Sequence, residues 1–270
     1  MQKTTQEPLL KDRSPQSSIA TGMRHYISHF RTIVKATWPI ATLTAIVSAL
    51  TSTAFYIYWP ELITHIYQDL TNAANYAGDY IFLLATIVTL CLITLIMTAV
   101  FTGAAASTLT GKKKKTISHS VKALLFLVLL LPLCVLSLGI LEVPLTYITT
   151  KYVIESDKGF FPLLFHKYTT SFRYWFRQFV VLVVCIIGIG VLHLLLGLPV
   201  YILAEANWQA RTGVIGGDPL GMPSYITALT FGTCMIVTFL QLYVWLPMLF
   251  ILYYLYGSIE SFVLRVNNER

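Results

Sequence analysis

The chain carries, from residue 180 to residue 204, the stretch VVLVVCIIGIGVLHLLLGLPVYILA, which contains no Asp, Glu, Lys or Arg. A helix of roughly 20 apolar residues is long enough to cross the hydrocarbon core of a bilayer. Further apolar stretches lie at residues 38–58, 80–109, 123–148 and 225–256. The sequence therefore predicts an all-α, polytopic integral membrane helical bundle with about five transmembrane helices.

The composition agrees with this fold class. Hydrophobic residues make up 56% of the 270 residues and charged residues only 11%, whereas soluble domains carry about 25% charged residues. A soluble protein would also need helices that are apolar on every side, with no polar face to meet water. The composition therefore argues against a soluble globular domain, and we expect residues 38–270 to form a single membrane domain.

The lysines and arginines of the first connections predict the orientation. The N-terminal arm, residues 1–37, has six of them, the connection 59–79 has none, and the connection 110–122 has five. Cytoplasmic loops are enriched in Lys and Arg, so we expect a cytoplasmic N-terminus in a multi-pass protein of the bacterial inner membrane. We expect no cleavable export signal, because the first apolar stretch starts late and is too long for one. The same rule explains the net charge of +7 without nucleic-acid binding.

The third apolar stretch, 123–148, does not fit this charge pattern. If it crosses, the cytoplasmic side holds 12 lysines and arginines and the outer side 7; if it enters the membrane and returns, the division becomes 18 against 1. Pro132, Gly139 and Pro144 are able to break the helix, but a turn exposed to lipid leaves peptide groups unpaired. Five crossings are the default interpretation, and the side of residues 149–177 and of the C-terminus stays open.

Two similar segments indicate a two-fold internal repeat. His29–Lys35 (HFRTIVK) comes before the first apolar stretch, and Ser171–Arg177 (SFRYWFR) comes before the fourth. Each leads into a pair of apolar stretches, and small residues close each pair, at 103–107 and 257–261. Such repeats are common in membrane proteins, although the match is short enough to arise by chance.

The basic and aromatic segments 26–35 and 160–179 are typical of interfacial helices, which place rings at the acyl boundary and cations among anionic headgroups. The candidate headgroup contacts are Arg31, Lys35, Lys167, Arg173 and Arg177. The simpler interpretation is an anchoring elbow that fixes the tilt of the following helix. In both interpretations the lipid bilayer is the first expected partner.

Small residues recur every four positions on the first two expected spans. They are Ala41, Ala45, Ala49 and Thr53 on the first, and Thr94, Thr98, Thr102 and Ala106 on the second. Such stripes let helix backbones approach closely, and threonine hydroxyls can bond to their own helix. We expect helix packing here rather than the lining of a pore.

Polar residues at membrane depth are the candidate functional residues. They are His193, Glu142, Glu205, Asn207 and Gln241. His193 lies near the middle of its stretch, where a neutral imidazole can relay protons or bind a ligand; the alternative is a structural hydrogen bond to a threonine or carbonyl of another helix. Asp218 lies in the turn before the last stretch, where a partner-binding loop is the alternative to a simple turn.

The sequence indicates no catalytic, cofactor-binding or metal-ligating set. The six histidines are scattered, no carboxylate completes a metal site beside His25 and His29, and no two polar residues have the spacing of a catalytic pair. The four cysteines fall one each in the second to the fifth stretch, at positions 91, 134, 185 and 234, where thiols act as small hydrophobes. We therefore expect a protein without enzymatic activity and without a cofactor.

Two segments near the C-terminus have a distinctive amino-acid sequence. Gly217–Tyr225 (GDPLGMPSY) and Leu252–Glu260 (LYYLYGSIE) resemble an uncharacterised group of polytopic inner-membrane proteins common in Bacteroidota, over about the last hundred residues. Members of that group often carry a carotenoid-oxygenase label. An enzyme of that class needs clustered histidines to bind its iron. The chain lacks them, so the resemblance implies a membrane and a lineage, and no catalytic residue.

Three functional hypotheses follow. The favoured one is a structural, assembly or accessory component of the cell envelope, with other membrane proteins or a second copy as partner. The alternative is a small-solute transporter or permease that uses the intramembrane polar residues. A lipid-acting membrane enzyme is the third, indicated by the basic aromatic helices alone.

Overall fold

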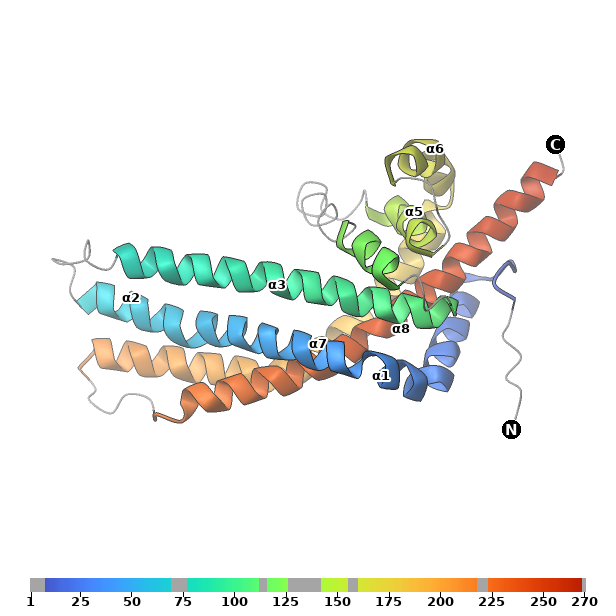
Figure 1. The fold of residues 1–270 in the computed structure, drawn as a ribbon. Helices are drawn as coiled ribbons and strands as arrows, with labels where there is room; N and C mark the ends of the chain where they lie inside the picture. Colours follow the sequence, from blue (N-terminus) through green and yellow to red (C-terminus); the bar gives the residue numbers. More distant parts are fainter. Residues whose placement is uncertain are drawn as a thin grey trace. The chain divides into compact units, whose positions relative to one another are not determined.

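The computed structural model describes residues 8–68, 77–111, 116–125, 142–154, 160–217 and 223–268, and every regular element in these ranges is helical (Figure 1). The elements are, in chain order, α1 (Pro15–Thr53), the π-helix η1 (Ala54–Tyr58), α2 (Trp59–Gln68), α3 (Ala77–Thr110), α5 (Glu142–Ile154), α6 (Phe160–Arg173), α7 (Trp175–Ile215) and α8 (Ile226–Asn268). Residues 116–125 are helical as well. The expected all-α class is confirmed.

Within the described ranges, four helical segments are long and apolar enough to cross a membrane. They are Pro15–Thr64, Gly78–Thr110, Trp175–Val214 and Ile226–Val266. They contain the first, second, fourth and fifth expected stretches. Most of the third stretch, residues 126–141, lies outside the described residues, and its path stays a prediction.

Two helices begin or end elsewhere than expected. Segment 26–35, expected as a separate interfacial helix, lies inside α1 without a break, because no helix-breaking residue separates it from the span. The expected helix 160–179 is divided: α6 ends at Arg173, and α7 begins at Trp175 after a turn at Tyr174. The Tyr174 N–H donates to the Ser171 carbonyl at 3.0 Å, which closes this turn.

The chain forms two compact units. Unit 1 comprises Met1–Thr37, Thr102–Gly190 and Trp245–Arg270, and unit 2 comprises Trp38–Phe101 and Val191–Val244. Each of the four long helices α1, α3, α7 and α8 contributes a segment to both units. Every one of the 19 lysines and arginines except Arg211 belongs to unit 1.

Unit 2 packs through small side chains. Ala41, Ala45 and Ala49 are fully buried, which confirms the packing face expected on α1. Ala49 belongs to a cluster with Val200 of α7 and Cys234 of α8. In contrast, the most apolar window of α3 has no buried residue, so its expected Thr94–Thr98 stripe is only partly covered; the hydroxyls of both threonines donate to carbonyls of α3.

Unit 1 contains close crossings at glycines. A Cβ on Gly22 of α1 would lie 2.6 Å from the Ile251 Cα of α8. A Cβ on Gly103 would overlap the backbone of Ser120, and one on Gly257 would overlap the carbonyl and side chain of Leu9. The small residues that close each half of the expected repeat are therefore points where another segment passes close to the helix.

The two flanks of the third apolar stretch meet inside unit 1. The Nδ1 atom of His119, which precedes the stretch, lies 2.5 Å from the carbonyl oxygen of Val153, which follows it. His119 is 1% exposed, and α5 is buried continuously from Val143 to Thr150. Both flanks thus belong to one packed body.

Candidate functional site

The N-terminal strap, residues 8–14, is hydrogen-bonded to the Ser258 hydroxyl of α8. The Ser258 oxygen accepts the Arg13 backbone N–H at 2.8 Å, and its hydroxyl donates to the Arg13 carbonyl at 3.1 Å. The Arg177 guanidinium donates to the same oxygen at 2.9 Å. Because a serine hydroxyl has one donor and two acceptor positions, Ser258 is fully used, and it joins the strap, α7 and α8.

Arg13 is the buried cation of this site, with 3% of its surface exposed. Its guanidinium donates to the carbonyls of Pro8 at 2.6 Å, Leu9 at 2.9 Å and Lys11 at 3.3 Å. It also lies 5.0 Å from the centroid of the Tyr254 ring. A buried charge is tolerated when it is hydrogen-bonded or paired, and here the strap wraps its carbonyls around its own arginine.

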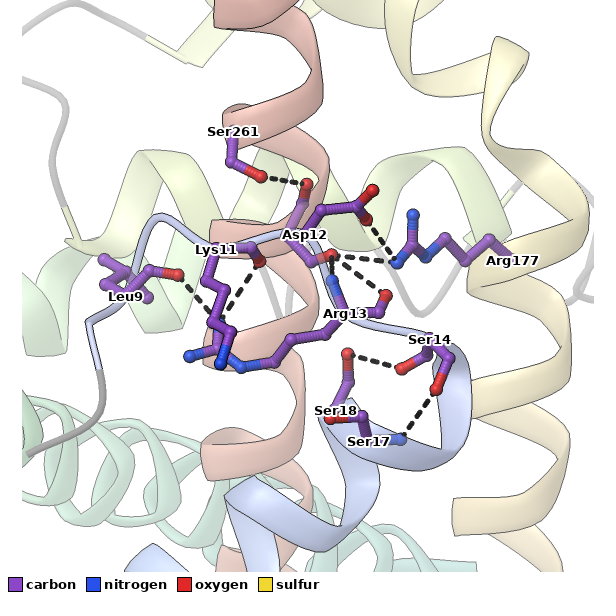
Figure 2. A network of polar contacts seen from close by, with 10 residues as sticks. Leu9, Lys11, Asp12, Arg13, Ser14, Ser17, Ser18, Arg177 and Ser261 are labelled. Atoms are coloured by element: carbon purple, nitrogen blue, oxygen red, sulfur yellow. Dashed lines mark hydrogen bonds and ion pairs between the residues drawn. The ribbon is translucent and has the colours of Figure 1, made fainter.

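The strap enters α1 through a capped helix end. Ser14 stands before Pro15, the first helical residue, and its hydroxyl oxygen accepts the Ser17 N–H at 3.2 Å (Figure 2). Serine at this position and proline at the next are the preferred start of a helix. Asp12 forms an ion pair with Arg177 at 3.1 Å. The strap is therefore fixed at both Asp12 and Arg13.

A second charged cluster lies on α5 and α8. The Lys151 ammonium donates to Glu260 at 2.6 Å, and the Tyr147 hydroxyl donates to the other oxygen of the same carboxylate. The Lys151 and Glu260 side chains are 16% and 13% exposed. Glu260 lies beyond the apolar stretch 225–256. Each oxygen of this carboxylate therefore has its own donor, which offsets the burial of the charge.

Gln178 connects the start of α5 to the α6–α7 turn and is fully buried. Its Oε1 atom accepts the Thr146 hydroxyl at 2.9 Å and the Tyr147 N–H at 3.3 Å. Its Nε2 atom donates to the Ser171 carbonyl at 2.9 Å. The Ser171 hydroxyl in turn donates to the Pro144 carbonyl. The amide is thus a structural bridge between α5 and α7.

Two of the predicted intramembrane residues are brought together. Gln241 Nε2 donates to the backbone carbonyl of His193 at 3.3 Å. A Cβ on Gly197, one turn after His193, would lie 3.7 Å from the same nitrogen. Gln241 therefore ties α8 to the backbone of α7, through the carbonyl of His193 and not through its imidazole.

Asn207 supports the π-helix. Its Nδ2 atom donates to the Tyr56 carbonyl at 2.8 Å, and the residue is fully buried. In an α-helix this carbonyl would accept the N–H of the fourth residue on, which is Pro60 and has none. Asn207 supplies the donor that the proline removes.

The remaining predicted residues are dispersed. Glu205 is exposed and accepts from Gln209 of its own helix at 2.8 Å. The Glu142 side chain and Asp218 lie outside the described residues. Of the candidate headgroup contacts, Arg31, Lys35 and Arg173 are exposed and Lys167 is half-buried, while Arg177 is engaged by Asp12 and Ser258.

The sequence analysis missed the residues that organise unit 1, namely Arg13, Tyr147, Lys151, Gln178 and Glu260. Glu260 carried a usable signal, since it follows the close-packing pair Gly257–Ser258 at the end of an apolar helix. The others carried none, because their partners lie more than 100 residues away or on another helix.

Within the described part of the chain, no three His, Cys, Asp or Glu side chains gather as a metal site would require. Comparison with family models, curated proteins and solved structures finds no match to this chain. The resemblance to inner-membrane proteins of Bacteroidota therefore stays a prediction, and function has to be argued from the chain's own geometry.

Proposed function

We propose that the chain is an integral membrane protein of the bacterial inner membrane with a structural, assembly or accessory role in the envelope. One observation carries the proposal: the buried charged residues of unit 1 are engaged by hydrogen bonds and ion pairs, while four phenylalanines of α6 and α7 are left exposed. These are Phe161, Phe165, Phe172 and Phe176, which are 57%, 80%, 57% and 72% exposed. Exposed apolar surface of this kind marks contact with lipid or protein, rather than a substrate site.

The proposal includes four crossings, with unit 1 on the cytoplasmic side. The unit holds 18 of the 19 lysines and arginines, which is the division that the positive-inside rule favours. The contact between His119 and Val153 also supports it. A straight helix over residues 123–148 would separate its ends by about 39 Å, and such a separation is incompatible with flanks that touch.

Cysteine accessibility tests this topology. Asp157 and Asp79 are each replaced by cysteine in a chain without its native cysteines, and whole cells are treated with a membrane-impermeant thiol reagent. We expect labelling at position 79 and none at position 157 until the cells are opened. Labelling of position 157 in intact cells would restore the five-crossing arrangement.

The aromatic surface also supports a place for unit 1 at the membrane interface. Phe161 and Phe165 lie one helical turn apart on α6, and Phe172 and Phe176 repeat that spacing across the Tyr174 turn. Arg173 is exposed beside them. Rings at the acyl boundary with a cation at headgroup level form the usual interfacial arrangement. Arg177 contributes less, since Asp12 and Ser258 occupy it.

Photo-cross-linking from native membranes tests the assembly role. A photoreactive amino acid is placed at Phe165, and at the exposed Ser224 of unit 2 as control. We expect a discrete protein adduct from position 165 and none from position 224. Adducts to lipid alone at both positions would reduce the role to membrane anchoring and count against assembly.

A transporter is the second candidate, because unit 2 buries three polar oxygens without partners among the described residues. A lipid-acting enzyme gains no such support from the part of the chain that the structure describes.

A further inference from the structure

In the interior of unit 2, the residues of neighbouring helices stay level with one another from one helical turn to the next. α1 and α7 run parallel: Ala49 packs with Val200, and seven residues later on each helix Tyr56 meets Asn207. α1 and α8 run antiparallel: Ser48 Oγ lies 3.4 Å from Thr238 Oγ1, and one turn on, Ser52 is hydrogen-bonded to Cys234. A further turn along both helices brings Tyr56 level with Thr230.

Three buried side chains from three helices lie near this level. They are Thr53 of α1, 5% exposed, Asn207 of α7, 0% exposed, and Thr230 of α8, 1% exposed. Thr53 continues the buried face of Ala49, and Thr230 lies one turn from Cys234, which packs against Ala49. Along the bundle axis the three residues are therefore within about one helical turn, or 5.4 Å, of one another.

Each of these side chains presents an oxygen with no hydrogen-bond partner among the described residues: Thr53 Oγ1, Thr230 Oγ1 and Asn207 Oδ1. The other threonines of α1 differ, since Thr44 and Thr51 donate to the carbonyl four residues earlier at 2.8 and 3.0 Å. The orientation of the Asn207 amide is fixed, because its Nδ2 donates to a carbonyl, which can only accept. Its Oδ1 is thus available as a ligand.

Buried polar atoms are normally satisfied, and each exception asks for an explanation. Three exceptions at one level, on three helices, point to a common ligand. The three atoms are all oxygens, the donor type of hard cations. The two carboxylates of this part of unit 2 are engaged elsewhere, Glu61 with Arg211 at 3.5 Å and Glu205 with Gln209. Neutral oxygens alone suit a monovalent ion, as carbonyl rings do in potassium channels.

We propose that Thr53, Asn207 and Thr230 form a binding site for a sodium-type monovalent cation that keeps part of its hydration shell. The π-helix beside it, where Asn207 replaces the donor that Pro60 lacks, fixes the asparagine that contributes one ligand. Irregular helical backbone beside ion sites recurs in membrane transport proteins. The site does not depend on the assembly role proposed above, and it would be the first element of the transporter alternative.

Thermal unfolding of the full-length protein in nanodiscs tests the site. The midpoint is compared in sodium chloride and in choline chloride at equal ionic strength, for the wild type and for Thr53→Val and Thr230→Val. Thr44→Val is the matched control, because Thr44 is as deeply buried but its hydroxyl bonds to its own helix. Binding of radioactive sodium to the same samples gives a readout that does not depend on stability.

We expect sodium to raise the wild-type midpoint by about 3 °C, and this shift and sodium binding to be lost in Thr53→Val and Thr230→Val but kept in Thr44→Val. In choline, Thr53→Val should be at least as stable as the wild type, because it removes a buried hydroxyl that has no hydrogen-bond partner among the described residues. Equal wild-type midpoints in both salts, without sodium binding, would overturn the proposal. Ordered water would then be the hydrogen-bond partner of the three oxygens. Loss of the shift in Thr44→Val would overturn it as well.

Discussion

Among the described residues, unit 1 joins polar groups that lie far apart in the sequence, whereas many hydroxyls of unit 2 bond to the carbonyl one turn earlier in their own helix. Arg13 and Ser258 are 245 residues apart, and Lys151 and Glu260 are 109 apart. Thr86 and Thr89 of α3, in contrast, donate to carbonyls four residues away. Unit 1 is therefore specified by tertiary polar contacts, and unit 2 by helix formation and small-residue packing.

A substitution at Gly257 should have the largest effect on stability, and it tests this difference between the two units most directly. Gly257→Val in unit 1 places a branched side chain where Leu9 crosses α8, and we expect a loss of about 3 kcal/mol in the free energy of unfolding. Gly232→Ala in unit 2 is the control, since its Cβ meets nothing within 4 Å, and it should be neutral or slightly stabilising. Thermal unfolding in nanodiscs measures both, and equal effects would mean that the strap does not sit on α8.

Arg13 tests whether the strap depends on its buried cation. Arg13→Met keeps the bulk but leaves three strap carbonyls without their donor, and we expect a loss of about 2 to 3 kcal/mol. Limited proteolysis should cut the variant within residues 8–14 at a protease concentration that spares the wild type. The exposed Arg31→Met serves as control, and a strap that resists the protease in both variants would show that Arg13 is dispensable.

Glu260 tests the second charged cluster. Glu260→Gln removes the partner of the half-buried Lys151 ammonium, so we expect a loss of about 2 kcal/mol near neutral pH. Glu205→Gln, on the exposed part of α7, should change little at any pH.

Asn207 offers a rescue experiment in unit 2. Asn207→Ala removes the side-chain donor to the Tyr56 carbonyl, and we expect a loss of about 1 kcal/mol. Adding Pro60→Ala restores an N–H at the position that an α-helix would use for this carbonyl. The double variant should therefore regain most of the lost stability. If Pro60→Ala were equally harmful with and without Asn207, the two residues would not share this function.

Gln241 should have the smallest effect of all. Its bond to the His193 carbonyl is long, at 3.3 Å, and that carbonyl lies within a continuous helix. Gln241→Leu should change the free energy of unfolding by less than about 0.5 kcal/mol. A larger loss would show that unit 2, like unit 1, depends on polar contacts between helices.

These contrasts also explain what the sequence could and could not predict. The helical class, four apolar spans and the alanine face of α1 follow from composition and spacing, which are local properties. Lys151 and Gln178 act through partners on other helices, so no local pattern marks them. Asn207 was identified as polar at depth, but its role depends on Pro60, which stands 147 positions earlier in the chain.

The crossing of Leu9 over Gly257 has a consequence for biosynthesis. The strap is translated before α8, so the strap's binding surface does not exist until that helix has been made. Until then the Tyr254 ring and the Ser258 hydroxyl are not available to Arg13. A chain stalled before α8 would therefore have a strap without the helix on which it packs.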